Sequence, residues 1–353
     1  MTETGRGASE SVSGGFWPMV WQRLRRNRRG MAGLHAVVLM LAVWLLSPLL
    51  ASSQPIACRY QGRWHFPGLV EMFQTRGGGR HWLEKSVPFN RPQFDARREL
   101  SGEDWAIWPL IPYDEFETTG DFLAAPSRRH WLGTDEVGRD LAARMIHGTG
   151  VSVKVGFVSM GIAAAIGVVL GGLAGYYGGW LDIVLSRVIE IVICFPVFFL
   201  ILAIMAWLEP NILNVMVVIG LTRWTSIARY ARGEFMRIKG QDYVSAAEAL
   251  GVPQARIMFR HILPNALAPV LVSVTFGVAA AILVEAGLSW LGFGVQPPAP
   301  SWGNILRAAY DSLRTAPHLV YPPCVAIFGA VLAYNLLGDA LRDAIDPRLR
   351  KGP

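Results

Sequence analysis

Side chains able to do chemistry are scattered along this 353-residue chain. His65, His81 and His130 form no His-x-x-x-His pair, and no two carboxylates have a spacing typical of acid–base catalysis. The three cysteines fit neither a disulfide framework nor a zinc site. No Gly-x-x-x-x-Gly-Lys-Ser/Thr loop occurs, so the usual cradle for ATP phosphates is missing. We therefore expect no catalytic residue, no metal and no cofactor in this chain.

The most informative spacing lies between residues 240 and 265, where helix signals alternate with helix breakers. Asp242 can cap a helix that begins at Tyr243. Gly251 and Pro253 follow as a C-terminal glycine with a proline two residues on, which predicts the end of that helix.

A second short helix is expected from Pro253 to about His261, and Pro264 is expected at the entry to the next long helix. Ala246, Ala247 and Gly251 are small, so the backbone of another protein could approach them closely. The pattern predicts either a docking knob for a partner protein or an ordinary amphipathic loop helix.

The composition indicates that lipid surrounds most of the chain. Hydrophobic residues make up 52% and charged residues 17%, whereas soluble domains carry about 25% charged residues. About 20 apolar residues suffice to cross a bilayer, and six segments are long enough. The predicted fold is an all-α polytopic membrane protein with about six transmembrane helices at 33–51, 151–176, 186–208, 211–230, 266–290 and 319–341.

Basic residues flank these segments and predict the orientation. Arginines cluster before the first segment, which predicts a cytoplasmic N-terminus. Six crossings also place the C-terminus in the cytoplasm, and the net charge of +7 needs no nucleic-acid partner to explain it. The predicted divisions are a cytoplasmic segment 1–32, a first transmembrane helix 33–51, a periplasmic insertion 53–146, a five-helix core 151–341 with a cytoplasmic loop 231–265, and a cytoplasmic tail 342–353.

Charged side chains inside the apolar segments are costly in lipid and therefore informative. Arg187 and Glu190 are three residues apart on one helical face and are expected to form a structural ion pair. Glu285 lies near the outer end of its segment. It is expected either to line a transport pathway or to pair with a cation on a partner subunit.

The run Ala246-Ala247-x-x-x-Gly251, closing in Ile262-Leu263-Pro264, resembles the EAA loop of ABC importer permeases. In that family the loop is a coupling helix that inserts into a cleft of the ATP-binding subunit. Ser245 departs from the pattern, since the family usually has glutamate there. The resemblance implies that coupling to the ATPase involves Asp242, Tyr243, Ser245, Ala246, Ala247, Gly251, Ile262, Leu263 and Pro264.

Further stretches resemble the second permease subunit of dipeptide and oligopeptide importers, in that family's order. They include His130-Trp131-Leu132-Gly133-Thr134-Asp135, Gly175-Tyr176-Tyr177-Gly178-Gly179 and Leu288-Ser289-Trp290-Leu291-Gly292-Phe293-Gly294. The chain length and the run from Arg59 to Pro67 are similar to the Yej-type branch.

The resemblance implies a type I permease fold in the bacterial inner membrane and the import of oligopeptides or peptide-like compounds by alternating access. It implies as partners a second permease, two ATP-binding subunits or one fused ATPase that bind ATP and Mg, and a periplasmic substrate-binding protein. Two alternatives are a secondary transporter without ATPases and a membrane-anchored periplasmic enzyme. The first would show inverted repeats, and the second would carry its chemistry in 53–146.

Overall fold

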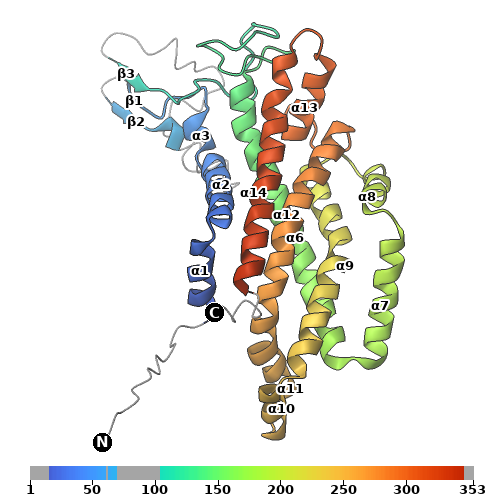
Figure 1. The fold of residues 1–353 in the computed structure, drawn as a ribbon. Helices are drawn as coiled ribbons and strands as arrows, with labels where there is room; N and C mark the ends of the chain where they lie inside the picture. Colours follow the sequence, from blue (N-terminus) through green and yellow to red (C-terminus); the bar gives the residue numbers. More distant parts are fainter. Residues whose placement is uncertain (1–15, 61–62, 70–103, 346–353) are drawn as a thin grey trace, which may run out of the picture.

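The computed structural model describes residues 16–60, 63–69 and 104–345, and long helices dominate it (Figure 1). The helices run side by side, with a small sheet at one end and a short helix pair at the other. The elements are α1 (Phe16–Arg26), α2 (Arg28–Leu45), α3 (Ser47–Leu50), β1 (Ala57–Tyr60), β2 (Arg63–His65), β3 (Trp105–Ile107), α6 (Leu141–Tyr177), α7 (Gly179–Cys194), α8 (Val197–Met205), α9 (Ile212–Lys239), α10 (Asp242–Ala249), α11 (Gln254–Arg256), the π-helix η2 (Ile257–Ile262), α12 (Leu263–Trp290), α13 (Trp302–Asp311), the 3₁₀ turn η3 (Pro317–Leu319) and α14 (Tyr321–Ile345).

Four of the described helices are long and apolar enough to cross a membrane. They are Arg28–Leu45, Leu141–Tyr177, Gln254–Trp290 and Pro317–Ile345. A fifth crossing results only if α7 and α8 count as one span, and these two helices meet at 80°. The predicted all-α membrane architecture is confirmed, whereas the count of six spans is not.

The single helix predicted over 186–208 is wrong. Phe195 has extended backbone angles and Pro196 precedes α8, so the helix breaks between Cys194 and Val197. The physical reason is that a proline ring disfavours helical angles at the residue before it. The break turns α8 back toward α9 (Figure 1).

Several other helix boundaries differ from the prediction. The N-terminal segment contains the helix α1, which was not predicted, and the first long helix ends at Leu45 rather than at residue 51. Residues 141–146 belong to α6 and not to the insertion. At the other end, α9 continues to Lys239 and α14 to Ile345, so polar residues extend both helices beyond the predicted spans.

The most extensive contact between two described helices is that of α6 with α9, and glycines make it possible. A Cβ atom added at Gly171 would overlap the carbonyl oxygen of Ala228. One added at Gly175 would lie 2.5 Å from the carbonyl oxygen of Arg232. Small residues let helix backbones approach in this way. On the same helix, a Cβ atom at Gly161 would meet nothing within 4 Å.

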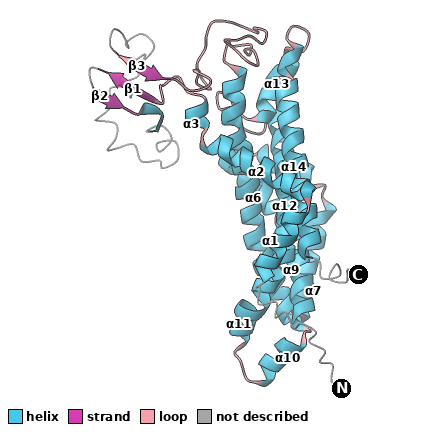
Figure 2. Ribbon diagram, turned by 60° about the vertical axis from the view of Figure 1, so that its left-hand side comes forward, coloured by secondary structure: helices cyan, strands magenta, loops and turns pink. Residues whose placement is uncertain are grey.

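The described part of the predicted insertion holds a three-stranded antiparallel sheet in the order β2-β1-β3. Backbone hydrogen bonds fasten it to the end of α3. The amide of Ile111 donates to Leu50 O (2.9 Å), and the amide of Ile56 donates to Ile107 O (2.8 Å). Figure 2 shows the sheet to one side of the bundle.

We predict opposite effects of adding one methyl group at two glycines of α6. Gly171→Ala should lower the free energy of unfolding by about 1–3 kcal/mol, because overpacking forces the two backbones apart. Gly161→Ala should leave it unchanged or raise it by up to about 1 kcal/mol, because alanine favours the helix. Thermal unfolding in detergent checks both. Equal melting temperatures for the two variants would contradict the packing account.

Candidate functional site

The helix α10 projects from the end of the bundle opposite the sheet (Figures 1 and 2). Val244 fastens it to the bundle and is fully buried. The apolar cluster around this side chain comes from three long helices and the π-helix. Its other buried members are Tyr176, Phe235, Ile238, Ile257, Ile262 and Ala266.

The end of α10 has the geometry of a Schellman motif. Gly251 has a φ of +73°, and its amide donates to Glu248 O (2.9 Å). The amide of Val252 donates to Ala247 O (3.1 Å). These two bonds satisfy carbonyls that the helix end would leave free, and the left-handed angle favours glycine. The predicted role of Gly251 as the terminator is confirmed.

The predicted start of this helix is wrong by one residue. Asp242 is the first helical residue, and Gln241 is the N-cap with no side-chain hydrogen bond to the helix. Asp242 therefore stabilises the helix through its charge in the first turn and not as a cap. Tyr243 follows it, with its side chain exposed.

The small residues of α10 face in different directions. Ala247 is half-buried and packs against the apolar cluster of its own subunit. Ser245 and Ala246 are exposed, and Leu250 is 83% exposed. The surface available to a partner is therefore formed by the exposed side chains and not by Ala247.

Pro264 lies in the first turn of α12, at the entry to the long helix as predicted. The two short helices before it are not separated from it, because α11, η2 and α12 form one continuous helix. The amide of Leu263 donates to Met258 O, five residues back. This wider π turn accommodates the proline, which lacks an amide hydrogen. Ile262 is fully buried beneath the turn, while Pro264 is exposed. The helix pair is thus built into the long helix α12.

Two basic side chains of α9 hold the corner between α6 and α7. Arg232 forms a bidentate ion pair with Asp182, in which Nη2 lies 2.7 Å from Oδ2. Lys239 donates from Nζ to Tyr176 O (2.7 Å) and lies 4.9 Å from the centre of the Tyr176 ring. The sequence did not predict these contacts. A carboxylate such as Asp182 near an apolar segment does indicate that a basic partner lies close by.

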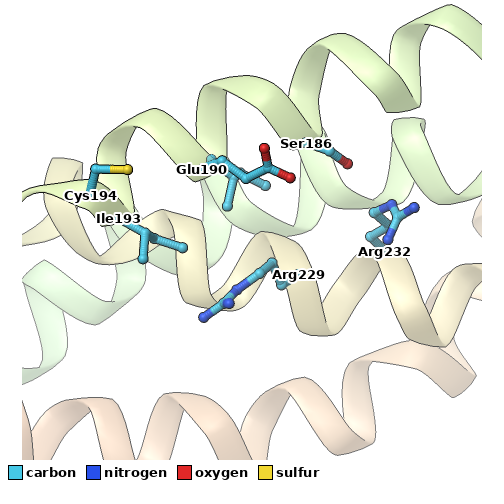
Figure 3. Close-up of a pocket in the computed structure, with 7 residues that line it drawn as sticks. Ser186, Glu190, Ile193, Cys194, Arg229 and Arg232 are labelled. Atoms are coloured by element: carbon cyan, nitrogen blue, oxygen red, sulfur yellow. The ribbon is translucent and has the colours of Figure 1, made fainter.

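The predicted ion pair between Arg187 and Glu190 is confirmed, with Nη1 2.5 Å from Oε2 and both side chains exposed. Glu190 also lines a cavity of about 430 Å³ between α7 and α9. Figure 3 shows Arg229 and Arg232 of α9 opposite Ser186 and Glu190 of α7. The wall of this cavity combines charged and apolar side chains.

Glu285 is fully buried inside its own subunit. Its Oε1 accepts a hydrogen bond from the Ser289 hydroxyl (2.7 Å), which in turn accepts from the amide of Val295 (3.1 Å). Ser301 lies 3.3 Å from Ser289, Oγ to Oγ, and caps α13. Lining a pathway and pairing with a partner both require an accessible carboxylate, and this conformation does not provide one. Glu285 here holds the hydroxyl of Ser289, and Ser289 joins α12 to the loop that leads to α13.

The motif that begins at His130 is structural. His130 Nδ1 lies 2.8 Å from Asp140 Oδ2, and Asp140 Oδ1 accepts from the amide of Ala143, which caps α6. His130 and Asp140 are both buried. A buried pair of this kind orders the entry to α6 and is closed to a substrate.

Two further residues of α6 hold the loops at the end of the bundle that carries the sheet. Arg144 donates to Glu115 O (3.2 Å) and to Pro298 O (3.4 Å). His147 contacts Glu115 Oε2 from Nδ1 (2.6 Å) and Ala51 O from Nε2 (2.8 Å). The first turns of α6 therefore join three segments that are distant in the sequence.

Comparison with known proteins defines the class. The family model of the binding-protein-dependent transport system inner membrane component matches residues 167–351. The model of the N-terminal transmembrane domain of oligopeptide transport permease C matches residues 15–62. The first match covers more than half of the chain, so the protein belongs to the family of inner membrane components of binding-protein-dependent transport systems.

Three similar proteins narrow the family. The inner membrane ABC transporter permease protein YejE of Escherichia coli is 34% identical over 93% of this chain and 96% of its own length. The dipeptide transport system permease protein DppC of Alkalihalophilus pseudofirmus is 38% identical over 69% of this chain and 80% of its own. The glutathione transport system permease protein GsiD of Pectobacterium atrosepticum is 39% identical over 70% of this chain and 82% of its own length.

The predicted permease of the dipeptide and oligopeptide ABC type is thereby confirmed, together with its type I fold. The chain is a transport subunit of the inner membrane and not an enzyme. The family match and the similar permeases therefore argue against both alternatives, a secondary transporter and a membrane-anchored enzyme. The similarity to YejE extends over 93% of this chain.

We predict that substitutions of Glu285 separate a structural role from a pathway role. Glu285→Gln should retain stability and transport, because the amide oxygen can accept the same hydrogen bond from Ser289. Glu285→Ala should lower the free energy of unfolding by about 1–3 kcal/mol, through the lost hydrogen bond and the cavity left behind. Thermal unfolding and uptake assays measure both. A stable Glu285→Gln variant that has lost transport would instead identify Glu285 as a pathway group.

Proposed function

We propose that this chain imports peptides or peptide-like compounds by alternating access, driven by partner ATPases. The observation that carries the proposal is α10, whose inner face is fixed to the bundle by Val244 while its outer face is exposed. The similar proteins named for dipeptide, glutathione and Yej transport support the substrate class.

The proposed partners are a second permease subunit, two ATP-binding subunits or one fused ATPase, and a periplasmic binding protein that delivers the substrate. ATP and Mg would be bound by the ATPase subunits, with no cofactor in this chain. The family description, an inner membrane component of a binding-protein-dependent system, supports such an assembly. Lipid is the other partner, given the apolar helices.

The contacts of α10 suggest how a movement of the ATPases would reach the membrane. A force on the exposed face of α10 acts on the apolar cluster and on α12, because α11, η2 and α12 are continuous. It also acts on α7, because Arg232 and Lys239 hold the corner between α6 and α7. ATP can shift the equilibrium between inward- and outward-facing states only by binding them with different affinity.

The proposed orientation places both termini and α10 in the cytoplasm, and the sheet in the periplasm. We predict that a cysteine at Phe122 labels with an impermeant thiol reagent in intact cells, whereas one at Gln254 labels only after the membrane is opened. Both side chains are exposed. Labelling of Gln254→Cys in intact cells would reverse the orientation.

For coupling, we predict that Ala246→Trp lowers transport at least about tenfold while the melting temperature stays unchanged. Ala246 is exposed, so a bulky side chain there disturbs only a partner, and packed interfaces tolerate added volume poorly. Uptake and ATP hydrolysis in proteoliposomes measure the effect.

Ala247→Trp is the matched control, because this side chain packs against its own subunit. It should lower the melting temperature as well as transport. Ser245→Trp, at the position that departs from the family pattern, should have a milder effect on transport. Normal uptake by Ala246→Trp would rule out α10 as the coupling surface.

A further inference from the structure

Aromatic side chains gather on one face of the small sheet. The strand register places Arg59 directly opposite both Trp64 and Trp105, so the three side chains share that face. Ile107 belongs to the same face, two residues after Trp105. Trp64, Trp105 and Ile107 are 58%, 40% and 52% exposed, whereas Cys58 is fully buried on the opposite face. We name Arg59, Trp64, Phe66, Trp105 and Ile107 the aromatic face.

Contacts between the rings hold the aromatic face in one arrangement. Trp64 meets Trp105 edge to face with 5.0 Å between ring centres, and it stacks on Phe66 at 6.4 Å. Side chains that already hold each other lose little conformational freedom when they bind. A contiguous exposed apolar patch is uncommon on a soluble protein and marks a binding surface.

The chain fixes the sheet close to the bilayer. The seven residue-to-residue steps from Leu50 to Ala57 span at most about 25 Å. The hydrogen bond of Ile111 to Leu50 joins the segment after β3 to the end of α3. In both views the sheet stands beside the bundle near the end of α2 (Figures 1 and 2). Exposed apolar side chains, Leu39, Leu45 and Leu46, lie on α2 and at its end.

We propose that the aromatic face binds the headgroup region of the lipid bilayer. Tryptophan is enriched at membrane–water interfaces because its ring is apolar and its N–H is polar. Arg59 lies between the two indole rings and is exposed, so its guanidinium can bind a lipid phosphate while its aliphatic part lies in the interface. The proposal depends on membrane insertion and is independent of the transported substrate and of the orientation.

Lipid contact can be measured with an environment-sensitive NBD probe on Ile107→Cys in the full chain. Cys194 and Cys324 are replaced by serine. Cys58 stays, because burial, together with the Asp104 carboxylate, raises the pKa of its thiol to about 11 and leaves it unreactive. In nanodiscs of phosphatidylethanolamine and phosphatidylglycerol, 5-doxyl phosphatidylcholine should quench the probe at least about twofold, as expected for a group at the interface.

The control places the probe on Phe122→Cys, which is 66% exposed and lies outside the sheet, and doxyl lipid should not quench it. The double variant Trp64→Ser and Trp105→Ser should weaken the quenching of the probe at position 107. Thermal unfolding of this variant checks that it still folds. A probe at position 107 that stays in water and is unquenched would overturn the proposal. Shielding that occurs only after the periplasmic binding protein is added would also overturn it and assign the face to that protein.

Discussion

The contact on which the rest of this structure depends is the close approach of α6 and α9. It exists because α6 presents glycines to the backbone of α9, at Gly171 against Ala228 and at Gly175 against Arg232. Lipid gives helices no hydrophobic reason to associate, so such packing has to come from shape. The contact fixes α9 along most of its length, and α9 in turn positions the end of the bundle that carries α10.

Different contacts organise the two ends of the bundle. At the end that carries α10, an apolar cluster around Val244 and the ion pair of Arg232 with Asp182 join α10 to α6, α7 and α9. At the end that carries the sheet, Arg144 and His147 hold loops through carbonyl oxygens and a carboxylate, and apolar clusters around Ile111 and Ile305 pack there as well. A motion of α10 therefore acts on a packed unit.

Features governed by local chemistry could be predicted from the sequence. Gly251 ends α10 because a helix end favours glycine, and Arg187 pairs with Glu190 because they are three residues apart. The continuous helix through Pro264 could not be predicted, because a π turn moves the hydrogen bonds out of the way of the proline. The burial of Glu285 depends on a loop after α12, and that contact leaves no signal in local spacing.

The central claim is that the exposed face of α10 contacts an ATP-binding subunit. Leu250 is the most exposed apolar side chain of this segment, at 83%, and the Schellman motif holds it in place. A photo-crosslinking amino acid at position 250, irradiated in the assembled transporter, should join this chain to the ATP-binding subunit, and the yield should change when ATP is added. Crosslinks to lipid or to the second permease alone, with the ATPase subunits present, would contradict the account.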